Sequence, residues 1–196
     1  MAEVLSTFLL RPGVQIPDFS LSDADGGWFA RGDVSGPNGL LVVFACNHCP
    51  FVIHVADALG GLAREIRHLG VHTVAINSND AHQYPQDAPE LMKSFATGHC
   101  WDFPYLIDDC QSVAKAYGAA CTPDFFLADA GGRLFYAGQF DDSRPRSGTP
   151  AHGGDLTEAV RRMLAGEDGL ARPYPSSGCN IKWKPGNEPV WASSRP

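Results

Sequence analysis

The sequence predicts an α/β fold in which helices flank a central mixed β-sheet, and three observations support this prediction. A continuous apolar run at residues 39–45 is typical of a strand that is buried on both faces. The apolar residues that follow recur every three or four positions, which is the pattern of a helix. A second β-branched run at residues 71–76 completes a strand, helix, strand unit, the building block of parallel sheets.

The helix of this unit is expected to begin near Pro50 and to end at a C-terminal cap at Gly70. Gly60 and Gly61 each disfavour a helix by about 1 kcal/mol relative to alanine. The length and periodicity of the segment outweigh that effect. Its apolar face consists of Val52, Val55, Leu59, Leu62, Ile66 and Leu69.

The elements expected downstream alternate between helix and strand. Asp87 and Glu90 resemble a capping box at the start of a helix that ends near Gly98. A short strand is expected at residues 103–107, and a brief helix from about residue 109 to 118.

Two β-rich runs, 124–129 and 133–138, flank a glycine pair and predict an antiparallel hairpin. A last helix is expected over about residues 155–165. These elements make residues 1–165 one domain. Residues 166–196 are rich in Pro and Ser but contain two tryptophans, so we expect an irregular tail that packs partly on the domain.

Composition and charge exclude several classes of protein. The chain has 196 residues, and its 44% apolar content is enough for a hydrophobic core. Its net charge of −7 repels a phosphate backbone, so we expect no nucleic-acid partner. No apolar segment reaches the roughly 20 residues that span a bilayer, so we expect no membrane association. The N-terminus lacks the pattern of a signal peptide, which predicts a cytoplasmic location.

Cys46, Asn47, His48 and Cys49 form a CxxC motif directly after the first predicted strand. The motif alone is compatible with a redox pair, half of a metal site or two buried thiols. A structural zinc site needs a second ligand pair, and the remaining cysteines contain no second CxxC. The strand before the motif and the helix after it favour a redox pair. The remaining cysteines are Cys100, Cys110, Cys121 and Cys179.

The predicted position of the motif suggests how it would work. Cys46 is expected at the start of the helix, where free N–H groups and the positive dipole end favour a thiolate, with Cys49 one turn later. Cys46 is expected at the exposed end of the pair, and His48 adds a tunable cation. A stabilised thiolate favours the reduced state, so we expect a reduction potential between about −270 and about −120 mV.

Four segments of the chain occur in the order of a known family: PDFSLSDADGG (17–27), CNHCPFV (46–52), AYGAACTPDFF (116–126) and DAGGRLFYAGQFDD (129–142). They resemble the thioredoxin-fold redoxins of the AhpC/TSA type, and the motif places the chain near a CNHC-type subgroup. The resemblance covers roughly residues 14–165 and implies a thioredoxin-like fold, with an N-terminal β extension and an irregular C-terminal tail.

The resemblance also implies roles for single residues. Cys46 matches the cysteine that attacks a partner, and Cys49 matches the one that resolves the mixed disulfide. Pro123 matches a cis-proline that faces the disulfide and holds the partner's extended backbone. Thr122 and Asn47 are the other expected substrate contacts.

Cys121 precedes Thr122 and is expected close to the redox pair. It could be a third thiol that accepts the disulfide, a metal ligand together with His48, or a packing residue. Cys179 would reach the same site if the tail folds back on the domain.

Two departures from the family pattern affect the predicted chemistry. The strand at residues 39–45 lacks the buried acid that accepts a proton in thioredoxins, so the proton must pass to another group such as His48 or water. Neither cysteine of the motif ends the Pro-x-x-x-Thr-x-x-Cys loop of peroxiredoxins. This difference argues against an efficient peroxidase.

We therefore expect a thiol-disulfide oxidoreductase that cycles between a Cys46–Cys49 dithiol and a disulfide, without a cofactor. Catalysis is assigned to Cys46, Cys49 and His48. Its partner would be a protein or small molecule with a thiol or disulfide, such as a thioredoxin or glutathione system. The alternatives are a weak antioxidant thiol peroxidase and a copper-binding or delivery protein that uses the two cysteines and a third soft ligand.

Overall fold

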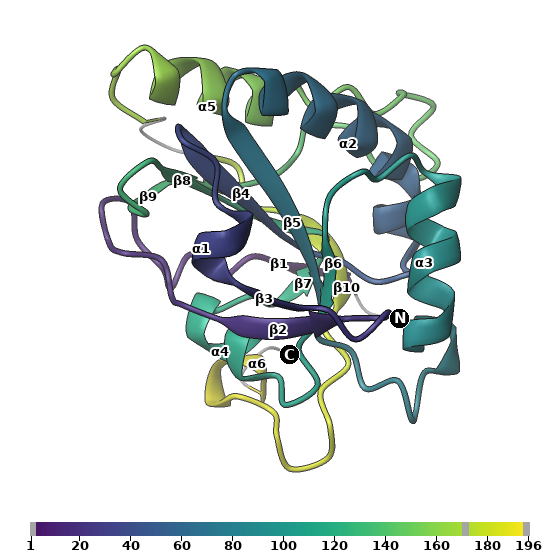
Figure 1. Ribbon diagram of the computed structural model, residues 1–196. Coiled ribbons are helices and arrows are strands. Elements are labelled where there is room, and N and C mark those ends of the chain that lie inside the picture. The colour runs from purple at the N-terminus through teal and green to yellow at the C-terminus, as the bar shows by residue number, and fades with distance from the viewer. Residues whose placement is uncertain (1–2, 170–172, 194–196) are drawn as a thin grey trace.

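The computed structural model describes residues 3–169 and 173–193 and has the predicted α/β architecture (Figure 1). The predicted strand, helix, strand unit is present as β4 (Gly39–Phe44), α2 (Pro50–His68) and β5 (Val71–Asn77). Strands β4 and β5 lie side by side, and the N–H of Ala45 donates to the carbonyl oxygen of Ile76 at 3.0 Å. The end of β4 is thereby fixed where the CxxC turn begins.

The central sheet is mixed, as predicted. Strand β5 pairs in parallel with β6 (Tyr105–Ile107), which continues to β2 (Ser20–Asp23) and β3 (Trp28–Ala30). On the other side, β4 pairs antiparallel with β8 (Asp124–Asp129). Strand β8 forms the predicted antiparallel hairpin with β9 (Leu134–Gly138).

Hydrophobic clusters cover both faces of this sheet. Successive side chains of a strand point to opposite faces, and β4 follows this rule. Leu41 and Val43 pack in the cluster beneath α2 and α5 (Gly154–Leu164), whereas Leu40 and Val42 pack in the cluster on the opposite face. All six residues of β4 are buried, so its continuous apolar run reflects burial on two sides.

The remaining helices surround the sheet, and one of them begins later than predicted. Helix α3 spans Pro89–Gly98 and its N-cap is Ala88. The predicted capping residue Asp87 instead ends a short 3₁₀ turn, η1 (Pro85–Asp87). Its carboxylate is used elsewhere, as described below. The other helices are α1 (Arg31–Val34), α4 (Ser112–Tyr117) and α6 (Val190–Ser193).

Gly60 has a structural role in α2 that explains its unfavourable helix propensity. A Cβ at this position would lie 2.5 Å from the carbonyl oxygen of His99, so only glycine lets α2 approach that segment. A Cβ at the neighbouring Gly61 would meet no atom within 4 Å, so that glycine carries only the propensity penalty.

The C-terminal segment, expected to be irregular, contributes a strand. Strand β10 (Ser177–Asn180) lies between β1 (Glu3–Leu5) and β7 (Cys121–Thr122) in an antiparallel sheet of three strands. The expectation was wrong here because these pairings join segments more than 50 residues apart, which local sequence patterns do not report. The part of the tail at residues 170–172 and 194–196 lies outside the described residues.

In the described part of the chain, no helix combines the length and the apolar character that crossing a bilayer requires.

Candidate active site

The CxxC motif forms a turn between β4 and α2, before the first turn of the helix. Helix α2 begins at Pro50, and Cys49 is its N-cap. Cys46 therefore precedes the helix by four positions, and the prediction that it lies at the helix start was wrong. Proline suits the first helical position because its missing N–H would have no intrahelical partner.

Both sulfurs contact Thr122, the residue before Pro123. Cys46 Sγ lies 3.4 Å from the Thr122 hydroxyl, and the Cys49 thiol can donate to the Thr122 carbonyl oxygen at 3.0 Å. The Thr122–Pro123 peptide bond is cis, as the family resemblance implies. The two cysteines are free thiols in hydrogen-bond contact with each other. The two sulfurs and the residue before the cis-proline thus form one compact group.

Both thiols are buried, with 1% of Cys46 and none of Cys49 exposed. The prediction that Cys46 lies at an exposed end of the pair was therefore wrong. Asn47 and His48, between the two cysteines, are only partly buried and form the outer side of the turn. An external reactant reaches either sulfur only after some covering group moves.

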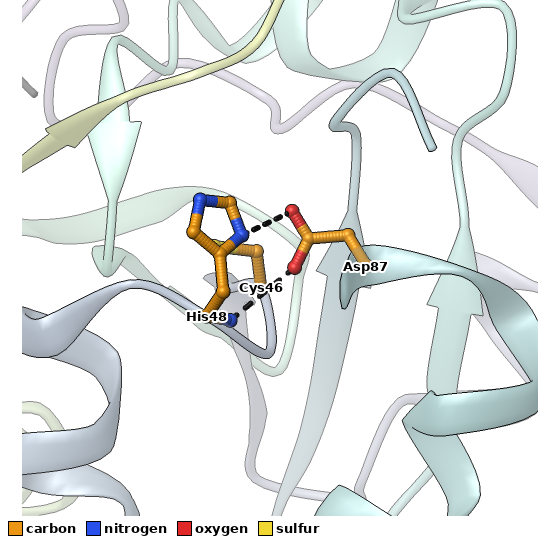
Figure 2. A group of neighbouring side chains, drawn as sticks. All are labelled: Cys46, His48 and Asp87. Carbon is orange, nitrogen blue, oxygen red and sulfur yellow. Dashed lines mark hydrogen bonds and ion pairs between the residues drawn. The ribbon is translucent and has the colours of Figure 1, made fainter. Parts of the chain in front are cut away.

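Asp87 anchors the outer side of this turn (Figure 2). One carboxylate oxygen accepts the backbone N–H groups of Asn47 at 2.8 Å and His48 at 3.3 Å. The other oxygen lies 2.8 Å from His48 Nδ1 and accepts the side-chain amide of Asn79 at 2.7 Å. Asp87 itself is 1% exposed, so these donors replace the water that the carboxylate loses on burial.

The two residues between the cysteines are held by this anchor and by aromatic neighbours. The His48 ring stacks on Tyr84 with ring centroids 5.8 Å apart. The Asn47 side chain donates to the carbonyl of Gln86 at 3.1 Å and accepts from the Tyr105 hydroxyl at 3.1 Å. Both ends of the Asn47 amide are thus bonded within the chain. Its role in substrate binding and the catalytic role of His48 stay predictions.

The expected lowering of the Cys46 pKa is also wrong. Contact with Cys49, burial and the negative charge of Asp87 raise the pKa of Cys46 above its ordinary value. Hydrogen bonds from the thiols of Cys179 and Cys46 lower the pKa of Cys49. The same contact with Cys49, together with burial, raises the pKa of Cys179. These shifts favour a thiolate on Cys49 over one on Cys46 or Cys179.

The third thiol in contact with the pair is Cys179 in β10. Cys179 is the register partner of Thr122, and its thiol is hydrogen-bonded to Cys49. The Cys121 thiol lies 3.5 Å from the carbonyl oxygen of Pro123, within its own turn. Neighbouring side chains of a strand point to opposite faces, so Cys121 points away from the face on which Thr122 contacts the pair.

One group at this site offers ligand atoms for a metal ion. The Cys46 sulfur, an imidazole nitrogen of His48 and a carboxylate oxygen of Asp87 lie within 4.8 Å of one another (Figure 2). A cleft of about 290 Å³ adjoins the same aspartate and is also lined by Asn77 and Asn79.

Sequence reasoning missed Asp87 as part of the site, although one signal pointed toward it. The segment at residues 77–80 follows a parallel strand at its C-terminal end, where sites of α/β proteins commonly form. Asn77 donates to the backbone carbonyl of Asp87 at 3.0 Å, and Asn79 donates to its carboxylate. These polar residues position the carboxylate that holds the CxxC turn.

Two solved structures of unknown function are similar to almost the whole chain. One is an uncharacterised conserved protein from Geobacillus kaustophilus, 46% identical, with a TM-score of 0.90 over 95% of this chain and 98% of that one. The other is a hypothetical protein from Sinorhizobium meliloti, 46% identical, with a TM-score of 0.89 over 93% and 99% of the two chains. No curated protein matches the sequence.

More distant structures share the fold. A secreted disulfide oxidoreductase of Mycobacterium tuberculosis, homologous to DsbE of E. coli, is 18% identical with a TM-score of 0.56 over 73% of this chain and 94% of its own. Peroxidoxin BcpB of the same organism is 17% identical with a TM-score of 0.60 over 80% and 97% of the two chains. The fold is thus shared with a protein described as a disulfide oxidoreductase and with one described as a peroxidoxin.

The sequence model of the AhpC/TSA family matches residues 12–137, a segment that includes the CxxC turn, Asp87 and the cis-proline. Together with the thioredoxin-like architecture and the paired thiols, this match shows that the chain belongs to the AhpC/TSA family, a family of thioredoxin-fold oxidoreductases.

Proposed function

We propose that this protein is a thiol-disulfide oxidoreductase that cycles between a dithiol and a disulfide at Cys46 and Cys49. The observation that carries the proposal is the contact between the two free thiols, both held against Thr122 before the cis-proline. Two sulfurs in contact form a disulfide with little rearrangement of the backbone. Burial keeps other nucleophiles away from the pair, which limits side reactions.

The favoured thiolate on Cys49 suggests how the reaction begins. Cys46 gives its proton to Cys49, its hydrogen-bond partner, and attacks one sulfur of the partner's disulfide. The partner's S–S bond breaks, and its second sulfur leaves as a thiolate. Cys49 passes the proton to that leaving thiolate and attacks the Cys46 sulfur of the mixed disulfide. The bond between Cys46 and the partner breaks, and the partner's first sulfur leaves as a second thiolate. The chain ends with a Cys46–Cys49 disulfide, having given two electrons to the partner.

The closed site favours a partner that needs little room. Strand β10 already lies antiparallel to β7 beside the pair, so an extended protein segment would have to displace it to pair there. A small thiol or disulfide needs only a local opening of the Asn47–His48 turn. We therefore favour a glutathione-sized partner over a protein bound along β7, in a cytoplasmic setting that supplies such thiols.

The direct test is trapping of the mixed disulfide. In a Cys49→Ser variant, Cys46 loses the residue that releases the partner, so incubation with oxidised glutathione should leave a glutathione adduct on Cys46, as detected by peptide mass spectrometry. A Cys46→Ser variant is the matched control and should retain no adduct on Cys49. Equal adducts in both variants would contradict the assigned roles, and no adduct in either would contradict the proposed exchange.

A second candidate function is copper binding, because Cys179 supplies the third soft ligand that this alternative requires. Thiol ligands select Cu(I), and three of them converge here. Retention of one equivalent of Cu(I) against a competing chelator, together with failure to reduce disulfides, would favour this candidate. We expect the protein to lose Cu(I) to the chelator and to reduce disulfides.

The third alternative, a thiol peroxidase, predicts hydroperoxide consumption. We expect this consumption to be slow, since the peroxide-orienting Pro/Thr loop is missing from the sequence.

A further inference from the structure

Strand β10 packs unusually closely on the residues that hold the redox pair. Its Cys179 is opposite Thr122, and Asn180 is opposite Cys121. A Cβ at Gly178 would lie 2.1 Å from the carbonyl oxygen of Thr122, a separation no side chain tolerates. Glycine at this position therefore lets the tail backbone rest directly on the Thr122–Pro123 peptide.

Hydrogen bonds on both sides fix β10 in this place. Before the strand, the Ser176 hydroxyl donates to the carbonyl of Gly138 at 2.7 Å. After it, the N–H of Ile181 donates to the carbonyl of Ala120 at 3.2 Å, and that of Lys182 donates to the Asn79 side chain at 2.8 Å. Asn79 also binds Asp87, so the tail and the CxxC turn share one support.

This packing brings Cys179 next to Cys49, which also contacts Cys46. Cys49 is in hydrogen-bond contact with Cys46 on one side and with Cys179 on the other. Cys179 is 4% exposed and lies in the same hydrophobic cluster as the pair. Buried thiols in contact are positioned for exchange, since thiol-disulfide exchange requires a thiolate to reach one sulfur of a disulfide.

We propose that Cys179 is a third redox cysteine, which exchanges with the Cys46–Cys49 disulfide by attacking Cys49. The S–S bond between Cys46 and Cys49 breaks as the bond between Cys49 and Cys179 forms. Cys46 leaves as a thiolate and takes up the proton that Cys179 gives up. The step is an isomerisation of one disulfide, so it needs no outside oxidant or reductant.

The exchange would have two consequences at the site. The oxidising equivalents stay in the chain as a Cys49–Cys179 disulfide, while Cys46 is again a free thiol beside the partly exposed turn. Strand β10 also becomes covalently attached to the start of α2. This inference rests on the proposed function, which supplies the first disulfide.

The test is to map disulfides in full-length protein treated with diamide, which oxidises neighbouring thiols directly. Trypsin leaves Cys46 and Cys49 together in the peptide of residues 32–64, and Cys179 in a separate peptide that ends at Lys182. A Cys46–Cys49 disulfide is therefore a loop within one peptide, whereas a Cys49–Cys179 disulfide joins two peptides. The two isomers are thus distinguished by mass alone.

In a Cys46→Ser variant we expect most of the chain to carry the cross-link between Cys49 and Cys179, and we expect Cys179→Ser in the same background to abolish it. A Cys46→Ala variant repeats the test in case the serine hydroxyl disturbs the buried site. In oxidised wild-type protein, acid quenching should trap both isomers.

The possible failures are distinguishable. The role of Cys179 would be overturned by two results together. Oxidised wild-type protein would hold only the Cys46–Cys49 loop, and Cys49 would stay a free thiol in both Cys46→Ser and Cys46→Ala. The proposed function would then remain intact. A cross-link from Cys49 to Cys121 would overturn the role of Cys179 as well. Wild-type protein without any disulfide among these cysteines would overturn the proposed function itself.

Discussion

At the scale of single residues, Asp87 determines the shape and the charge of the candidate site. Its carboxylate accepts two backbone N–H groups of the CxxC turn and lies 2.8 Å from His48 Nδ1. Its negative charge also opposes ionisation of Cys46. Asp87 therefore does not replace the acid that thioredoxins carry at the position of β4, because it opposes the ionisation of Cys46. In the proposed reaction the proton of Cys46 passes to Cys49 instead.

We expect an Asp87→Asn substitution to lower the pKa of Cys46, because it removes a negative charge close to the sulfur. The measurement is the ultraviolet absorbance of the thiolate against pH in a background where the other five cysteines are serine, so that Cys46 is the only thiol. Loss of hydrogen bonds to a charged acceptor should also destabilise the fold by about 1–3 kcal/mol.

Asp109→Asn is the matched control for this prediction, since Asp109 is an exposed carboxylate that pairs with Lys184 at 2.7 Å. It should change neither the pKa of Cys46 nor the stability by a comparable amount. An unchanged or higher pKa of Cys46 in the Asp87→Asn variant would show that the charge of Asp87 does not act on this sulfur.

A second residue-scale prediction concerns Asp124, which follows Pro123 and is fully buried. Burial raises the pKa of Asp124 to about 7, despite hydrogen bonds from the N–H of Ala120 and the hydroxyl of Ser6. In the unfolded chain an aspartate titrates near about 3.9. Between about pH 4 and about pH 7, the folded state therefore keeps a proton on Asp124 that the unfolded state has lost. The contribution of Asp124 to stability is present in full below about pH 4 and is lost as the pH rises to about 7.

Wild-type protein should lose stability as the pH rises from about 5 to about 8. We expect this loss to be smaller in Asp124→Asn, by a few kcal/mol in order of magnitude. Urea unfolding of the wild-type and variant proteins at both values measures this difference. Asp141→Asn is the control. Burial raises the pKa of Asp141, but hydrogen bonds from Ser143, His152 and Gly153 outweigh it and leave a lowered pKa. Asp141 is thus ionised in both states over this range. An identical pH dependence in Asp124→Asn and wild type would contradict the prediction.

At the scale of elements, strand β10 is the part of the fold that closes the site. It pairs with β1 and β7, and its close approach to the Thr122–Pro123 peptide depends on Gly178. The central helix and sheet place the two cysteines together, but they leave the side occupied by β10 uncovered. On that side, the accessibility of the thiols therefore depends on the C-terminal segment.

We expect Gly178→Ala to move β10 away from β7, because the added Cβ meets the backbone of Thr122. The consequence should be faster alkylation of Cys46 and Cys49 by iodoacetamide in the native state, and a loss of stability of about 1–3 kcal/mol. Gly61→Ala in α2 is the control, since nothing lies within 4 Å of its Cβ, and it should slightly stabilise the protein. Alkylation of the thiols at the wild-type rate in Gly178→Ala would show that β10 does not limit access.

The helices and strands that the sequence predicted correctly are those whose patterns depend only on neighbouring residues. The apolar run of β4, the periodicity of α2 and the glycine pair of the β8–β9 hairpin each reflect interactions within a short segment. The contact between Cys46 and Cys49 is equally local, because four residues in one turn determine it.

Features that depend on distant pairings were not predictable in the same way. Asp87 has the local pattern of a helix cap, yet its carboxylate binds a turn 40 residues earlier. Cys121 was one possible third thiol because it adjoins Thr122, and Cys179 was expected at the site only if the tail folds back. Cys179 contacts the pair through a strand formed from the tail. Neither pairing leaves a periodic signal in the sequence, since both are set by how the sheets assemble.

At the scale of the whole molecule, a sheet with two hydrophobic faces carries a thiol pair just after its β4 strand, and β10 of the C-terminal segment packs beside that pair. The proposed reaction requires this pair to take up and release two electrons reversibly. The most direct measurement is a redox titration of the full-length protein in glutathione buffers, with the mass of the alkylated protein as the readout. We predict one reversible loss of two hydrogens, with a midpoint between about −270 and about −120 mV. It should map to a disulfide of Cys49 with Cys46 or, after the exchange, with Cys179. The account would be contradicted if Cys46 and Cys49 both remained thiols throughout the titration.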